Sequence, residues 1–118
     1  MNKIALISLG CAKNLVDSEV MMGHLRKSPY VFVPSPEEAD IIIINTCGFI
    51  KPAKDETENA IQNALSIKHQ NKKVRIIVTG CYVERYISVL RNNYPEVDVW
   101  LGVKDFDKIV RAVQDKPI

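Results

Sequence analysis

The chain has 118 residues, enough for one compact domain with a hydrophobic core of its own. Its composition, 47% apolar and 25% charged, excludes a disordered or fibrous chain. A formal net charge of +2 gives no electrostatic reason to expect binding to nucleic acid or to a membrane surface.

Strand and helix patterns alternate along the sequence. The first part of the chain predicts a buried strand at 3–9, an amphipathic helix at 15–27, a short strand at 30–33, one helical turn within 34–40 and an apolar strand at 41–44. The second part predicts a helix that begins near Pro52, a strand at 75–79, a helix over 83–94, a strand at 99–101 and a last helix capped by Asp105.

This alternation predicts an α/β fold, a three-layer sandwich around a parallel five-stranded sheet with the flavodoxin-like order 2-1-3-4-5. Residues 41–44 are four isoleucines without polar alternation, so this strand should lie in the centre of the sheet. The start of the chain lacks a cleavage pattern for secretion, and no apolar run has the length of a membrane span. We therefore expect a soluble, cytoplasmic protein.

All three cysteines follow predicted strands. Cys11, Cys47 and Cys81 come just after the first, third and fourth strands, each beside a glycine. In the order 2-1-3-4-5 these strands are neighbours, and their carboxyl ends form the rim where open α/β sheets bind ligands. The sequence therefore predicts that the three thiols meet at one rim.

Several kinds of site could account for three thiols. Unpaired cysteines are often simply buried, and this interpretation stays open. A disulfide would leave one thiol over and is disfavoured in a reducing compartment. Zinc usually needs four ligands with closely spaced pairs, and His24 and His69 fall in or after predicted helices. A flavin or phosphate site would need more than the single glycine and Lys13 of "GCAKN". An iron–sulfur cluster with three cysteine ligands and one open iron fits the pattern best.

Three stretches carry a resemblance to a known family: "LGCAKNLVDSE" at 9–19, "ADIIIINTCGFI" at 39–50 and "VTGCYVERY" at 78–86. Together they resemble the amino-terminal domain of the radical-SAM methylthiotransferases. The sequence is most similar to the RimO type, which modifies an aspartate of a small-subunit ribosomal protein. The nearest relative is the MiaB type, which modifies an adenosine of transfer RNA; "SLGCAKN" and "NTCGFI" favour the ribosomal-protein branch.

The resemblance implies that Cys11, Cys47 and Cys81 hold an auxiliary four-iron four-sulfur cluster, whose open iron carries the sulfur that is methylated and transferred. It implies no catalytic residue in this chain. Residues that match the family pattern would support the cluster loops through capping and hydrogen bonds, although ordinary helix capping and strand-end pairing explain each of them equally well. These residues are Asn14, Asp17, Ser18, Glu19, Asn45 and Thr46.

The resemblance also implies a longer enzyme, a transferase of sulfur-containing groups. Its radical-SAM domain, with a second four-iron four-sulfur cluster and S-adenosylmethionine, needs a C-x-x-x-C-x-x-C motif, and no cysteine follows Cys81. We therefore expect residues 1–118 to be the amino-terminal domain without the radical-SAM domain or the carboxyl-terminal substrate-recognition module, and to be inactive alone. The expected partner is a ribosomal protein, without membrane or nucleic-acid binding by this domain. Two alternatives remain: a non-catalytic flavodoxin-like binding module with buried thiols, and a flavodoxin-like electron carrier.

Overall fold

The computed structural model describes residues 2–9, 19, 23, 25, 30–46, 51–71 and 73–102; within these ranges it describes only the backbone of residues 2, 51–54, 81–82 and 84–85, Cys81 among them. The first half contains β1 (Asn2–Ser8), β2 (Tyr30–Phe32), the 3-10 turn η1 (Pro36–Glu38) and β3 (Ile41–Thr46). The second half contains α2 (Lys51–Gln70), β4 (Arg75–Gly80), α3 (Cys81–Asn93) and β5 (Val99–Leu101).

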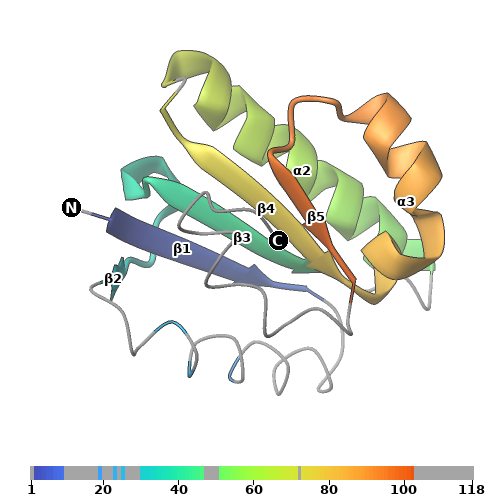
Figure 1. The fold of residues 1–118 in the computed structure, drawn as a ribbon, viewed down its shortest axis with the longest axis horizontal. Helices are drawn as coiled ribbons and strands as arrows, with labels where there is room; N and C mark the ends of the chain where they lie inside the picture. Colours follow the sequence, from blue (N-terminus) through green and yellow to red (C-terminus); the bar gives the residue numbers. More distant parts are fainter. Residues whose placement is uncertain are drawn as a thin grey trace.

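The five strands form one parallel sheet in the order β2-β1-β3-β4-β5, which confirms the predicted fold (Figure 1). All strands run in the same direction, so the carboxyl ends of β1, β3 and β4 lie side by side at one edge. The strand predicted to be central, β3, pairs with β1 on one side and β4 on the other. Every residue of β3 is buried, as expected for a strand covered on both faces.

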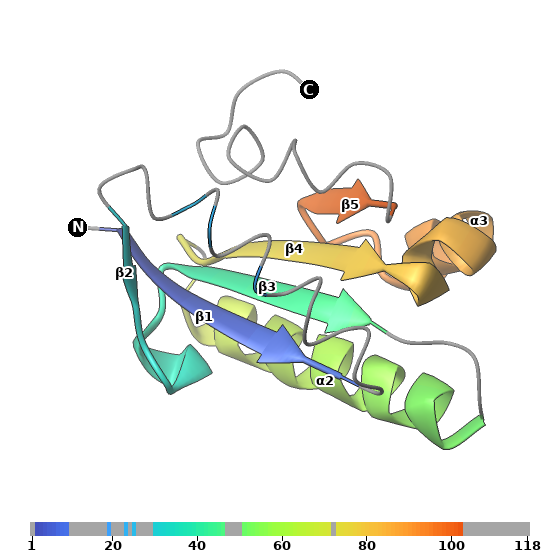
Figure 2. The same cartoon turned by 90° about the horizontal axis from the view of Figure 1, so that it is seen from below.

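Side chains alternate between the two faces of the sheet, and each face has its own apolar core. Ile42, Ile44, Ile76 and Val78 belong to the core under α2 and α3, together with Ile61 of α2. Figure 2 shows α2 along this face, with α3 beyond the end of β4.

The opposite face has its core around Ile4, Ile43 and Ile77. Leu25 is fully buried in this core and helical, in agreement with the predicted helix over 15–27. In the described part of the chain, that helix is represented by Glu19, Gly23 and Leu25. The predicted last helix after Asp105 lies outside the described residues.

Local sequence signals explain the helix boundaries. Pro52 is the second residue of α2, in the first turn, where a missing N–H costs no intrahelical hydrogen bond. At the end of α3, the Tyr94 N–H donates to the Leu90 carbonyl at 2.8 Å, and Pro95 follows. None of the helices in the described ranges is both long and apolar enough to span a bilayer.

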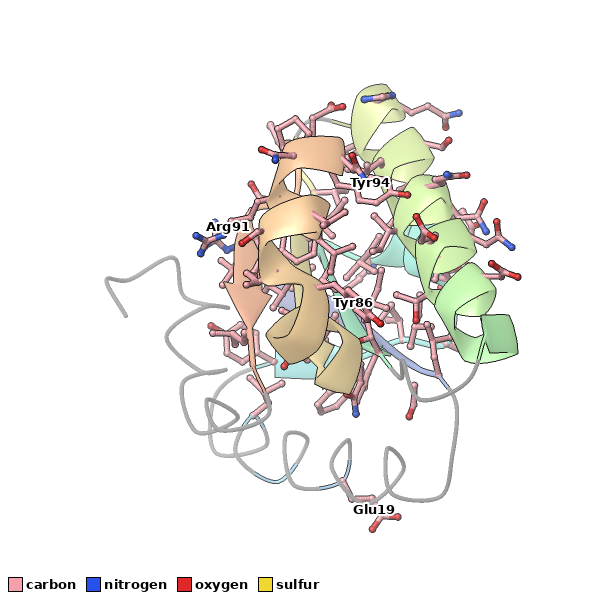
Figure 3. All side chains as sticks on the ribbon, turned by 90° about the vertical axis from the view of Figure 1, so that its right-hand side faces the viewer. Glu19, Tyr86, Arg91 and Tyr94 are labelled. Carbon is pink, nitrogen blue, oxygen red and sulfur yellow. The ribbon has the colours of Figure 1, made fainter. Side chains whose placement is uncertain are left out.

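One feature of α3 was not predicted. The helix is kinked at Tyr86, whose φ of −123° and ψ of 27° are non-helical, so the first turn, which contains Cys81, is offset from the rest. Most kinks occur at proline or glycine, and α3 contains neither. Tyr86 packs beside the core under α2, and Figure 3 shows its ring on the side of α3 that faces α2.

Candidate metal centre at the carboxyl rim of the sheet

The three strands that precede the cysteines end in register. Ser8 of β1 pairs with Asn45 of β3, and Asn45 pairs with Thr79 of β4. One residue further along, Thr46 pairs with Gly80, directly before Cys47 and Cys81. Beyond Ser8 the chain still follows β3, because the Leu9 N–H donates to the Asn45 carbonyl at 3.0 Å.

Of the three predicted ligands, one lies among the described residues. Cys11 and Cys47 lie outside the described residues. Cys81 directly follows β4, as predicted, but it is already the first residue of α3, which begins two residues before the predicted helix, and its side chain is not described. The assignment of the three cysteines as metal ligands therefore stays a prediction.

The predicted supporting residues also divide into two groups. Asn14, Asp17 and Ser18 lie outside the described residues, and Glu19 is exposed. Asn45 and Thr46 are fully buried at the end of β3, which is where a supporting role would require them. The Thr46 hydroxyl donates a hydrogen bond of 2.7 Å to the Thr79 carbonyl and so ties the end of β3 to the end of β4.

Gly80 allows β3 and β4 to approach at the rim. Its φ of +109° lies in a region that L side chains rarely adopt. A Cβ built on Gly80 would lie 2.5 Å from the Thr46 carbonyl oxygen, 2.7 Å from the Thr46 nitrogen and 2.8 Å from Oδ1 of Asn45. Only glycine fits between the two strand ends, so its presence fixes where the backbone turns into α3.

A row of polar side chains at this rim was not singled out from the sequence. Ser8, Asn45 and Thr79 occupy register-matched positions on three adjacent strands, and Asn45 and Thr79 are fully buried. Each is the first polar residue after an apolar run, in "IALIS", "IIIIN" and "IIVT". This shared position was the signal that could have identified the row, because the predicted strand order already made the three strands neighbours.

His69, the described one of the two histidines, does not contribute to the rim. Its Nε2 lies 2.6 Å from Oε2 of Glu96, near the end of α2 and before β5. Among the described residues, no three histidine, cysteine, aspartate or glutamate side chains are grouped as ligands for a metal. A zinc site built around His69 is thus not supported.

A hollow in the surface lies elsewhere. It is formed by β1, η1 and α2, and its lining includes Ile7, Pro36, Glu37, Asn63 and Ile67. The residues that line it are mainly apolar, and none of them belongs to the polar row or to the strand ends next to the cysteines. The rim is the candidate site because the paired strand ends there directly precede Cys47 and Cys81.

Comparison with known proteins places the sequence among relatives. A family profile described as "Uncharacterized protein family UPF0004" matches residues 3–102. A protein of Sulfurihydrogenibium sp. named "Ribosomal protein uS12 methylthiotransferase RimO" is 50% identical over 115 residues, 98% of this chain and 26% of the relative.

Proteins with the same name from other bacteria have similar sequence identity to this chain. The one from Campylobacter jejuni is 48% identical over 98% of this chain, and the one from Dictyoglomus thermophilum is 46% identical over 96% of it. In both cases the match covers 26% of the relative. The chain thus spans about a quarter of the length of the curated relatives it matches.

Proposed function

Since the chain belongs to the UPF0004 family, the amino-terminal domain of MiaB- and RimO-type proteins, we propose that it holds a four-iron four-sulfur cluster. The ligands in this proposal are Cys11, Cys47 and Cys81. The domain would carry the cluster as part of a longer methylthiotransferase.

The observation that carries this proposal is the register of the strand ends. Thr46 and Gly80 are partners across adjacent strands, and the next residue on each strand is a cysteine. One strand spacing of about 4.8 Å and two steps of about 3.8 Å keep the two cysteine Cα atoms within about 12 Å of each other, whatever course the chain takes. Cys11 follows two residues after Leu9, which is bonded to the same strand end.

The surroundings of the rim fit such a group. Because Gly80 has no side chain, the backbones of β3 and β4 approach each other closely at this point. Cysteine thiolates are the donor set that iron–sulfur clusters use in proteins. A cluster held by three cysteines supplies, when bound, an open iron at which sulfur can be held for transfer.

The protein supplies position and burial. Thr46 fixes the spacing of β3 and β4 through its bond to the Thr79 carbonyl, and Asn45 fills the buried end of β3. Ile43 and Ile77 lie two residues before Asn45 and Thr79, on the same face of the sheet. Their apolar side chains keep water away from this face. Asn14 and Asp17 remain proposed supporting residues of the loop after β1.

The names of the relatives support the choice of substrate. The similar proteins are named methylthiotransferases of ribosomal protein uS12. We assign the same substrate class to the longer protein that this domain would serve, together with a second cluster and S-adenosylmethionine in its remaining part. Because the substrate is a ribosomal component, the enzyme would work in the cytoplasm. The transfer-RNA branch of the family is the alternative.

Anaerobic reconstitution of the 118-residue chain with iron and sulfide tests the proposal. We expect about four irons per chain and a broad visible absorbance, because a four-iron cluster bound by thiolates absorbs across the visible range. Replacing Cys11, Cys47 or Cys81 by alanine one at a time should lower the bound iron. A Ser66→Ala variant, changed on the exposed side of α2, is the control for effects of purification and reconstitution. It should bind as much iron as the wild type.

Two results would contradict the proposal. Equal iron content in the triple cysteine variant and the wild type would show that the thiols are not the ligands. Purified protein with the yellow absorbance of a flavin, and no iron uptake, would support the electron-carrier alternative instead.

A further inference from the structure

The face of the sheet opposite α2 and α3 carries the polar row at its carboxyl end. Asn45 and Thr79 follow Ile43 and Ile77 by two residues, so their side chains lie on the same face as those isoleucines. Both polar residues are fully buried. Each also comes two residues before a cysteine, Cys47 or Cys81.

The Thr79 hydroxyl is the unexplained polar group of this row. Its Oγ1 is buried and has no hydrogen-bond partner among the residues that the structure describes. The carbonyl of the same residue accepts the Thr46 hydroxyl at 2.7 Å, so the backbone of Thr79 is satisfied while its side chain is not. Buried hydroxyls without a partner are costly and uncommon in native proteins, which indicates that the acceptor is a further group at the rim.

The place of the hydroxyl restricts what this acceptor can be. The neighbours of Thr79 in the sheet, Asn45 and Leu101, occupy the register positions on both sides. Ile77 precedes it on the same face, and Cys81 follows two residues further along the chain, at the carboxyl rim. A thiolate or an inorganic sulfide at this rim would accept a hydrogen bond from the threonine O–H.

We propose that Thr79 is a positioning residue whose hydroxyl donates a hydrogen bond to a sulfur of the bound cluster. This inference rests on the proposed function of the rim. Hydrogen bonds to cluster sulfurs are one of the means by which proteins set the reduction potential. Because a reduced cluster carries more negative charge, a hydrogen-bond donor stabilises it and raises the potential.

A pair of variants at one position tests the role of the hydroxyl. Thr79→Val keeps the shape of the side chain and removes the O–H, whereas Thr79→Ser keeps the O–H and removes the methyl group. After reconstitution of the whole chain, a redox titration followed by visible absorbance should give a lower potential for Thr79→Val. The potential of Thr79→Ser should stay close to that of the wild type.

Thr57→Val is the matched control. Thr57 is equally buried, but it belongs to α2, on the other face of the sheet. The same chemical change there should leave the potential unchanged. A second measurement needs no cluster: the urea midpoint of cluster-free Thr79→Val should not fall below that of the wild type, because the variant removes a buried hydroxyl that lacks a protein acceptor.

The outcomes separate this inference from the proposed function. If the wild type takes up no cluster, the proposed function and the role of Thr79 are both overturned. If the wild type loads and Thr79→Val has the same potential, only the role of Thr79 is overturned. A clear loss of stability in cluster-free Thr79→Val would also overturn it, since the hydroxyl would then bond to protein. Cluster uptake lost in Thr79→Val and kept in Thr79→Ser supports the contact, whereas uptake lost in both overturns it.

Discussion

Gly80 illustrates how one residue sets the geometry of the rim. It ends β4 and directly precedes Cys81, so there is no loop in which a poor fit could be absorbed. Its ψ of −171° together with the positive φ belongs to a region that is essentially restricted to glycine. The close approach to Thr46 adds a second, independent reason, because there is no space for a methyl group.

Gly80→Ala should therefore destabilise the domain by about 2–4 kcal/mol, the sum of backbone strain and overpacking. Gly23→Ala is a matched control, since Gly23 is helical and a Cβ there meets nothing within 4 Å. The control should gain about 0.5–1 kcal/mol, because alanine is the better helix former. Urea denaturation measures both free energies of unfolding, and similar values for the two variants would refute the role of Gly80.

At the scale of elements, Tyr94 connects α2 and α3. Its hydroxyl donates to Oε1 of Glu58 at 3.2 Å, and its ring belongs to the core under both helices. Figure 3 shows Tyr94 directed toward α2, whereas Arg91 points away from it. Burial raises the pKa of the Tyr94 phenol, and the nearby Glu58 carboxylate raises it further, against a lowering effect of Gln62.

The raised pKa has a consequence for stability at high pH. The phenol of Tyr94 has a higher pKa in the folded state than its ordinary value of 10.0. The stabilisation that the phenol gives to the folded state is therefore complete below pH 10.0 and is lost as the pH rises through the folded-state pKa. Tyr94→Phe should cost about 0.5–1.5 kcal/mol at neutral pH and progressively less as the pH rises above 10.0.

Urea denaturation of both proteins across this range measures the difference. Glu58→Gln is the control for the cause of the shift: it removes the charge but keeps the burial, so most of the pH dependence should remain. A constant difference between wild type and Tyr94→Phe would contradict the assignment.

The order of the elements was predictable because it depends on local patterns. The apolar runs at 41–44 and 75–79 and the apolar face of the helix after Pro52 all appear where expected. The kink at Tyr86 was not predictable, since the sequence around it has the composition of an ordinary helix.

At the scale of the whole molecule, the chain corresponds to about a quarter of its named relatives. It contains three cysteines in all, and the proposal uses each of them for one cluster. This leaves none of the three for the second cluster that we propose for the longer protein. Under the proposed function, the remaining part of a longer protein would supply that chemistry.

The isolated chain should thus fail to methylthiolate uS12, even when its own cluster is loaded. A longer protein that contains this chain should modify uS12 when S-adenosylmethionine and a reductant are present. Mass spectrometry of the ribosomal protein measures the addition of the methylthio group, and transfer RNA in a parallel reaction tests the alternative branch. Modification of transfer RNA with no change in uS12 would contradict the assignment of the substrate, and activity of the isolated chain would contradict its expected inactivity.

The sequence by itself determined the class of fold, the strand order and the position of each cysteine after a strand, because apolar periodicity and chain connectivity are local properties. Only the tertiary structure decided the register that pairs Ser8 with Asn45 and Asn45 with Thr79, that Gly80 has no room for a side chain, and that the Thr79 hydroxyl is buried. These facts depend on register and on contacts between residues more than 30 positions apart. No local pattern encodes such contacts, since they arise when separate strands are aligned in one sheet.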